Sequence, residues 1–170
     1  SSEPAAYTGR LNIPDFGVVG EVAILRFLTA SSREPSRVVN ASPDQFAATQ
    51  ERLLTAGVQP ADGDSSVRSL IAVQRFCHVN GTACGLLEDT RRGKRLIDGS
   101  RKEIISSHLS HFRWSDLAAA ADLLKHALDR SIELGFPAMF CSIPSAAWEQ
   151  LKPLLHGLEF QQTSATIYGY

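Results

Sequence analysis

The sequence lacks an excess of charge of either sign. Its 170 residues include 17 lysine and arginine residues and 18 aspartate and glutamate residues, so the formal net charge is −1. A nucleic-acid-binding protein generally needs a basic surface to displace the counterions of the phosphates, and a polybasic membrane anchor needs a similar cluster. No apolar run approaches the ~20 residues of a membrane-spanning helix. We therefore expect neither nucleic acid nor a membrane as a partner.

Cysteine is also scarce. Cys77, Cys84 and Cys141 form an odd, widely spaced set, which is a poor framework for disulfides and favours reduced thiols in the cytoplasm. Cys77 and Cys84 lack the Cys-x-x-Cys spacing, so no structural zinc site is predicted. Cys141 stands in an apolar segment and is interpreted as a small core residue. We expect a cytoplasmic protein without a bound metal.

The remaining composition suits one domain. Hydrophobic residues make up 44% of the chain, which is enough for a sizeable single core. Residues 1–16 contain two prolines and one glycine and are predicted to form an N-terminal arm or linker. Residues 17–170 are predicted to form the domain. Because Met139 is the only methionine, we expect a processed chain or a part of a longer one.

The first half of the domain is predicted to begin with a strand and a helix. Residues 18–28 (VVGEVAILRFL) are rich in β-branched and aromatic residues, which favours a buried strand. Ser42, followed by Pro43 and Gln45, predicts a helix start with a capping box. Gly57 is well placed to end that helix.

Three further β-like segments follow. They are residues 68–79, 82–88 and 102–114. Asn80-Gly81 is a strong signal for a tight turn between the first two. Together the three segments predict an antiparallel meander.

The second half begins with the clearest helical pattern, residues 115–134. Ser115 is predicted to cap this helix, and Gly135 to end it. The remaining elements are predicted as a strand over 136–143, a helix from Ser145 to about 156 that Pro153 bends or ends early, and a strand over 163–170. This order predicts an α/β fold with a mixed sheet, in which the two strands joined by the long helix run parallel.

The order of elements, with two local patterns, resembles a Gcn5-related N-acetyltransferase (GNAT) domain. Leu123-Leu124 followed by Gly135 is similar to the central helix of that family. The closing patterns are residues 143–148 (IPSAAW), residues 157–160 (GLEF) and Tyr168-Gly169. The resemblance covers about residues 66–170 and is weaker over 18–57. It implies a GNAT-like fold, a mixed and mostly antiparallel sheet flanked by helices.

The resemblance also implies an N-acyltransferase with acetyl-CoA or another acyl-CoA as cosubstrate. In that family a primary amine, on a small molecule or a peptide, attacks the thioester directly while the enzyme holds both reactants. The pyrophosphate lies on free amides at a helix N-terminus, where the family usually carries Arg/Gln-x-x-Gly-x-Gly/Ala. Ser115, Ala118 and Ala120 stand at those three positions, so the motif is degenerate in this chain.

The acyl-CoA contacts that the resemblance implies are mostly backbone contacts. The pyrophosphate would lie on the amides of Ala118, Ala119, Ala120 and Ala121. Ser145 corresponds to an asparagine that often helps to hold CoA in the family. A simpler interpretation of the alanine run is that it gives high helix propensity and close packing on the sheet.

Three residues are candidates for the general base. His108 and His111 are separated by an odd number of positions on the segment 102–114, which predicts that they point to opposite faces of the strand. An ordinary histidine titrates at about pH 6.5 and could accept the proton of the amine. Glu88 lies where the family often keeps a base. Each could instead be a packed or solvated side chain. Leu155 replaces the tyrosine that the family often uses as the acid.

Two further polar groups could take part. Tyr168 and Tyr170 could supply the missing acid, or could simply pack at the edge of the sheet. The basic run 91–95 (RRGKR) could contact an acidic substrate or the 3′-phosphate of CoA, or form only a solvated hairpin tip.

The degenerate motif and the missing acid leave a second hypothesis open. The domain could be a GNAT-like module without catalysis, or one half of a tandem protein, with a homodimer or a partner domain as its context. A third hypothesis is a small hydrolase that uses Cys141 and a histidine, although no local sequence signature supports it.

Overall fold

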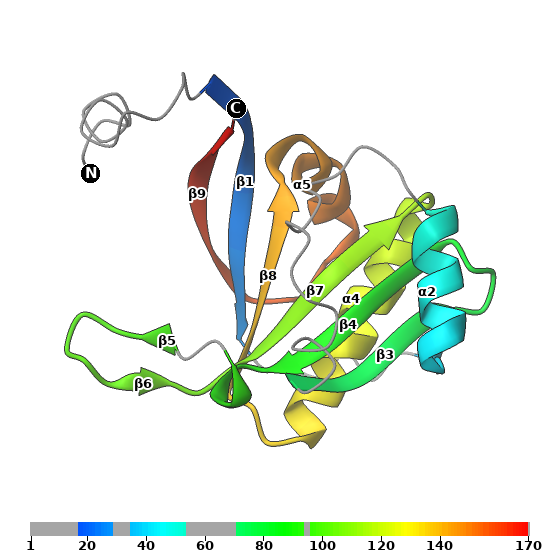
Figure 1. Cartoon of the computed structure of the whole chain (residues 1–170), viewed down its shortest axis with the longest axis horizontal. Coiled ribbons are helices and arrows are strands. Elements are labelled where there is room, and N and C mark those ends of the chain that lie inside the picture. Colours follow the sequence, from blue (N-terminus) through cyan, green and yellow to red (C-terminus); the bar gives the residue numbers. More distant parts are fainter. Residues whose placement is uncertain (1–16, 29–34, 54–70, 94–95, 170) are drawn as a thin grey trace.

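The computed structural model describes residues 17–28, 35–53, 71–93 and 96–169, which form one large sheet with helices on both faces (Figure 1). The strands of this sheet are β1 (Gly17–Leu28), β2 (Val38–Asn40), β3 (Ala72–His78), β4 (Ala83–Asp89), β7 (Ser107–Trp114), β8 (Ala138–Pro144) and β9 (Phe160–Gly169). The helices are α2 (Pro43–Arg52), α4 (Leu117–Glu133) and α5 (Ser145–Leu151), with 3-10 turns η1 (Thr90–Arg92) and η2 (Lys152–Leu154). A small hairpin is formed by β5 (Leu96–Ile97) and β6 (Glu103–Ile104). The predicted arm at 1–16 and the predicted helix end at Gly57 lie outside the described residues.

The strands follow the order β2-β3-β4-β7-β8-β1-β9 across the sheet. Among the described strands of this sheet, β7 and β8 form the only parallel pair, and the other neighbours are antiparallel. α4 connects β7 to β8, so this pair is the parallel crossover predicted from the sequence. The predicted α/β fold with a mixed, mostly antiparallel sheet flanked by helices is confirmed.

β1 takes an internal place in the sheet although it is the first strand of the chain. It pairs with β8 on one side and with β9 on the other. Ala23, Leu25 and Phe27 are fully buried on one face, and Val22 on the opposite face is only 7% exposed. Burial on both faces explains why this segment is almost continuously apolar. The predicted strand is confirmed, and its register places it between the last two strands of the chain.

α2 covers one face of the sheet beside β3 and β4. Ser42 Oγ accepts a hydrogen bond from Gln45 N at 3.2 Å, and Gln45 Oε1 accepts one from Ser42 N at 3.0 Å. The predicted capping box is therefore confirmed. Phe46 packs against Cys77 of β3 and Cys84 of β4, so both cysteine side chains lie on the face of the sheet that α2 covers.

α4 and α5 cover the opposite face. The residues that α4 buries are Ala119, Ala120, Ala121, Leu123, Leu124, Ala127, Leu128 and Ser131. They pack on Leu87 and Leu109 of the sheet in one continuous core. Gly135 has φ 79 and ends α4 as predicted. None of the helices that the structure describes is long and apolar enough to cross a bilayer.

The predicted boundaries differ most in the segment 102–114 and at the start of the last strand. The segment 102–114 divides into β6 and β7, because Ser106 turns inward between them, where its carbonyl accepts a hydrogen bond from Thr90 Oγ1 at 2.8 Å. The β5–β6 hairpin is therefore inserted into the predicted meander and pairs outside the large sheet. α5 ends at Leu151 and continues as a 3-10 turn through Pro153, which confirms the early end. β9 begins at Phe160, three residues before its predicted start.

Candidate functional site

β7 and β8 separate after a short parallel contact. Their pairing comprises Ser107 with Met139, His108 with Phe140 and Leu109 with Cys141. β7 then continues along β4 to Trp114, while β8 continues along β1 to Pro144. The two strands visibly diverge beyond this point (Figure 1). Among the residues that the structure describes, the backbone groups of β7 beyond Leu109 that point toward β8 therefore have no strand partner on that side.

A β-bulge lies in β7 just where the strands separate. Leu86 pairs with Ser110 and Cys84 pairs with Arg113, so β7 contains one residue more than β4 over this stretch. His111 lies within the extra length and has φ 51, in the left-handed region that non-glycine residues seldom adopt. The bulge bends β7 next to the residues that the sequence nominates as a base.

α2 holds the bulge in place. Gln50 Nε2 donates a hydrogen bond to the His111 carbonyl at 3.3 Å, and the His111 ring meets the Phe46 ring edge-on, with centroids 6.5 Å apart. A contact with a helix from another part of the chain therefore offsets the strain of the positive φ. His111 is packed against α2 and has this structural role.

Glu88 and His108 form a partly buried pair on β4 and β7. They are cross-strand neighbours, and His108 Nδ1 lies 3.2 Å from Glu88 Oε2. Glu88 is only 3% exposed, while the His108 side chain is 21% exposed. When Nδ1–H donates a hydrogen bond to the carboxylate, Nε2 carries the lone pair and can accept a proton from a ligand. The structure therefore brings together two of the three predicted base candidates.

The prediction that His108 and His111 point to opposite faces is wrong. Glu88, the partner of His108, lies on the same face of β4 as Leu86, which belongs to the cluster around Phe46. The His111 ring also contacts Phe46. Both histidines are therefore on the α2 face, because the extra residue of the bulge reverses the alternation that simple strand geometry predicts.

Ser110 adds a hydroxyl to the same face. It lies two residues after His108 on β7, directly before the bulge. In the part of the chain that the structure describes, Ser110 Oγ is buried and makes no hydrogen bond. Leaving a buried hydroxyl without a partner is costly, so Ser110 Oγ is a group that a water or a ligand could satisfy. The sequence contained no signal for this residue, because a serine on a strand becomes informative only through its surroundings.

The start of α4 differs from the predicted pyrophosphate site. Asp116, not Ser115, is the N-cap, and its carboxylate accepts a hydrogen bond from Ala119 N at 2.7 Å. Ser115 N instead donates to Thr82 O at 2.9 Å and so extends the strand pairing. The predicted cap at Ser115 is therefore wrong by one residue.

Few of the predicted amides are left for an anion. Ala120 N already donates to Asp116 O at 3.0 Å, and Ala121 lies far enough into the helix for its N–H to bond within it. The side chains of Ala119, Ala120 and Ala121 are buried in the core, while Ala118 is exposed. The carboxylate of Asp116 also has the same sign as a phosphate. These residues do not fit a diphosphate in the manner that the resemblance implies.

The other residues implied by the resemblance lie at and after α5. Ser145 is the first residue of α5, and the N-cap of this helix is Pro144, which offers no side-chain hydrogen bond. Leu155 is 3% exposed and belongs to the core, so it fills space and offers no proton. Tyr168 belongs to β9, and Tyr170 lies outside the described residues.

The basic run is not a hairpin tip over its first two residues. Arg91 and Arg92 form η1, directly after β4. Arg91 donates to both oxygens of Asp89, from Nε at 2.9 Å and from Nη2 at 2.8 Å, and stacks over the Phe136 ring at 5.0 Å. This arginine is therefore held in a structural ion pair. Lys94 and Arg95 lie outside the described residues.

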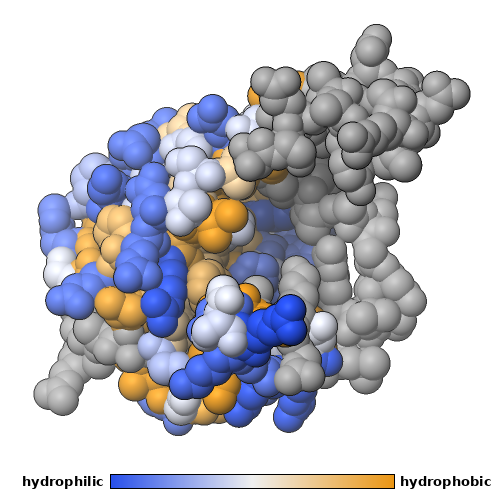
Figure 2. Space-filling view, turned by 90° about the vertical axis from the view of Figure 1, so that its left-hand side faces the viewer, coloured by the Kyte–Doolittle hydropathy of each residue, from blue (hydrophilic) through white to orange (hydrophobic). Residues whose placement is uncertain are grey.

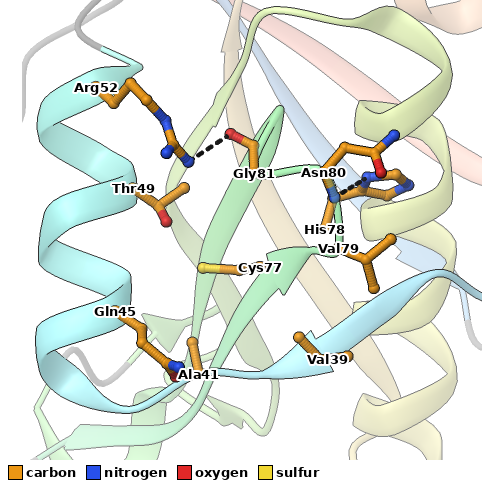
Figure 3. Close-up of a pocket in the computed structure, with 10 residues that line it drawn as sticks. All are labelled: Val39, Ala41, Gln45, Thr49, Arg52, Cys77, His78, Val79, Asn80 and Gly81. Atoms are coloured by element: carbon orange, nitrogen blue, oxygen red, sulfur yellow. Dashed lines mark hydrogen bonds between the residues drawn. The ribbon is translucent and has the colours of Figure 1, made fainter.

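A separate pocket of about 280 Å³ lies between α2, β2 and the β3–β4 turn (Figure 3). The Cys77 sulfur points toward α2 there, and burial raises the pKa of the Cys77 thiol against the opposing effects of Thr49 and Arg52. Arg52 Nη2 donates to Gly81 O at 3.2 Å. The thiol is protonated at neutral pH, so this pocket presents no activated nucleophile. Within the described ranges, no three histidine, cysteine or acidic side chains gather as a metal site.

Comparison with known proteins identifies the fold. No protein-family model and no curated protein matches this chain. A solved structure from Novosphingobium aromaticivorans, assigned to the GNAT family of acetyltransferases, is 16% identical over 92% of this chain and 68% of that chain, with a TM-score of 0.55. A functionally unknown conserved protein from Staphylococcus epidermidis is 9% identical over 99% of this chain and 68% of that chain, with a TM-score of 0.53. At these identities the similarity shows the fold alone, and the expected GNAT-like fold is confirmed.

Proposed function

We propose that this chain transfers an acyl group from a thioester to an amine, with the Glu88–His108 pair accepting the proton of the amine. The pair is the observation that carries the proposal, because a buried carboxylate 3.2 Å from a partly exposed imidazole is the arrangement of a supported general base. The GNAT-like fold supports the same reaction class. The bulge and the parting of β7 from β8 lie beside the pair.

The proton transfer follows from the chemistry of amines. A primary amine is mostly protonated at neutral pH, with a pKa of about 10.4 for a lysine-like group, and it attacks only as the free base. His108 Nε2 can take the proton while Glu88 accepts the hydrogen bond from Nδ1–H and stabilises the imidazolium that forms. The nitrogen then forms its bond to the acyl carbon and the carbon–sulfur bond breaks. The second proton that the nitrogen loses ends on the departing thiolate, which is released as the free thiol.

Ser110 is proposed to hold one reactant. Its buried Oγ has no hydrogen bond within the described residues, and it shares the face of β7 with His108. A hydroxyl can donate to a carbonyl oxygen or accept from an ammonium group. No residue of α4 is assigned to the diphosphate of an acyl-CoA, because Asp116 already caps the amides there.

The experiment is a thiol-release assay with a panel of acyl-CoA donors and of amines on small molecules and peptides. We expect turnover by the wild-type chain and a fall in kcat of ~10²–10⁴ in His108→Gln. Glu88→Gln should retain more activity than His108→Gln. Its pH profile should differ from that of the wild type, because the imidazole has lost its carboxylate partner. His156→Gln, at an exposed position, is the matched control and should equal the wild type. Equal turnover in His108→Gln and wild type would contradict the assignment.

A catalytically inactive GNAT-like module is the second candidate. Two observations favour it, the Asp116 carboxylate at the start of α4 and the buried Leu155 where the family often has an acid. A module of this kind should show no thiol release with any donor and no heat of CoA binding by calorimetry at millimolar ligand. CoA binding with turnover would exclude it.

A further inference from the structure

The two edges of the sheet are built differently. At one edge, β2 is only three residues long, and Arg37 directly precedes it. A short edge strand beside a charge is a common protection against pairing with another chain. At the other edge, β9 runs for ten residues, Phe160–Gly169 (FQQTSATIYG), with no charged residue and no proline.

β9 has one strand partner among the described residues. It pairs with β1 along its length, and the sheet ends at β9 in the described part of the chain. Half of its backbone N–H and C=O groups, those of about five residues, therefore point away from β1. Gln161, Thr163, Ser164 and Thr166 are exposed, so no described segment covers their side chains. In the view onto this side, hydrophobic and weakly polar residues lie between the hydrophilic patches (Figure 2).

We infer that β9 is an interaction edge that pairs antiparallel with β9 of a second copy of this chain. A strand edge is complementary to its own copy across a two-fold axis perpendicular to the sheet, since each donor then meets an acceptor of the other copy. The strand contains no charge that would meet the same charge on the partner. Threonine, isoleucine, tyrosine and phenylalanine are also residues that favour strands.

The geometry restricts which residues meet. A two-fold axis perpendicular to the sheet joins the two copies into one continuous sheet. Equivalent side chains then point to the same face, so Thr163 of one copy lies on the same face as Thr163 of the other. With the axis at Ser164, beside the middle of the strand, the two Thr163 side chains lie in diagonal positions, about 8 Å apart. This distance is within the Debye length at physiological salt, so charges placed there interact.

The experiment uses the full chain and measures its mass by sedimentation equilibrium over a wide concentration range. We expect a concentration-dependent dimer for the wild type. Thr163→Lys and Thr163→Glu should each raise the dissociation constant at least about tenfold, because each places like charges across the edge. Raising the salt concentration should partly restore both dimers. Circular dichroism checks that the variants fold, since Thr163 is exposed and points to solvent.

Two controls make the test specific to β9. Mixing Thr163→Lys with Thr163→Glu should restore a dimer that contains one copy of each, detected by native mass spectrometry. Val39→Lys places the same charge on β2, at the opposite edge, where Val39 is 48% exposed, and should dimerise like the wild type. A monomeric wild type, dimeric Thr163 variants, a mixture that does not recombine, or dissociation of Val39→Lys would each overturn the inference.

Discussion

Replacing Asp116 by asparagine is predicted to increase the affinity of the chain for CoA. Asp116 Oδ1 accepts the hydrogen bond of Ala119 N at 2.7 Å, at the turn where a diphosphate would be expected to lie. Asparagine is an equally good N-cap, so Asp116→Asn keeps the hydrogen bond and removes only the charge. The loss of the favourable carboxylate–dipole interaction should cost less than about 1 kcal/mol of stability.

The size of the gain follows from the distance. The cap occupies the Ala119 amide in both chains, so a diphosphate would lie beside this turn and not on that amide, at a distance between the charges taken as ~5 Å. Two unit charges at that distance repel by ~0.8 kcal/mol in a water-like medium and by ~3 kcal/mol at an effective dielectric of 20. Asp116 is exposed, so the lower end applies, and ~1 kcal/mol corresponds to about a fivefold lower dissociation constant.

Calorimetry of the wild type and Asp116→Asn with CoA measures this difference. Pantetheine, which has no diphosphate, is the matched ligand and should bind both chains equally. The gain for CoA should shrink as salt is added, because the carboxylate is exposed to solvent. Equal CoA affinity of the two chains, or an equal gain for pantetheine, would refute the electrostatic explanation of the altered α4 start.

Three further predictions test the core and its charges. Burial raises the pKa of Cys84 and Cys141 to about 12, so both thiols should resist iodoacetamide in the native chain and react only on unfolding; rapid modification of Cys141 in the native chain would revive the hydrolase hypothesis. Trp148 is fully buried, so Trp148→Ala should lower the free energy of unfolding by about 3–5 kcal/mol, measured by urea denaturation, and a loss below 1 kcal/mol would contradict the packing. Hydrogen bonds from Arg91 lower the pKa of Asp89. Their contribution to the free energy of unfolding is therefore present above the pKa of the unfolded state and is lost as pH falls through the lower pKa of the folded state. Asp89→Asn should flatten the loss of stability below about pH 4, and an unchanged dependence of stability on acid pH would disprove the link.

Local signals in the sequence predicted local structure well. The Ser42 capping box and the glycine end of α4 depend on a few neighbouring residues and on backbone geometry that only certain residues adopt. The start of α4 was displaced because Ser115 and Asp116 are both good caps. Ser115 N donates a hydrogen bond to Thr82 O across the sheet, so Ser115 stays in the strand pairing and Asp116 becomes the cap. A local signal fails when a distant partner selects between two equivalent neighbours.

The sequence did not predict which strands and residues lie opposite one another, for a related reason. Glu88 and His108 were both nominated, but their contact depends on the β4–β7 register across 20 residues that include the inserted hairpin. Hydrophobic alternation tells which face a residue occupies, and it does not tell which residue lies opposite. The position of β1 between β8 and β9 has the same origin, because an apolar strand suits several central places in a sheet.

The bulge at His111 shows how the candidate site depends on packing from outside it. A histidine at φ 51 has no advantage in an isolated strand. Gln50 and Phe46 of α2 stabilise that conformation through the carbonyl and the ring of His111, and the bulge then places His108, Ser110 and His111 on one face. Removing the amide with Gln50→Ala should therefore weaken the bulge and lower the activity of the Glu88–His108 pair without touching either residue. The geometry of the site is thus set by a helix that lies about sixty residues earlier in the chain.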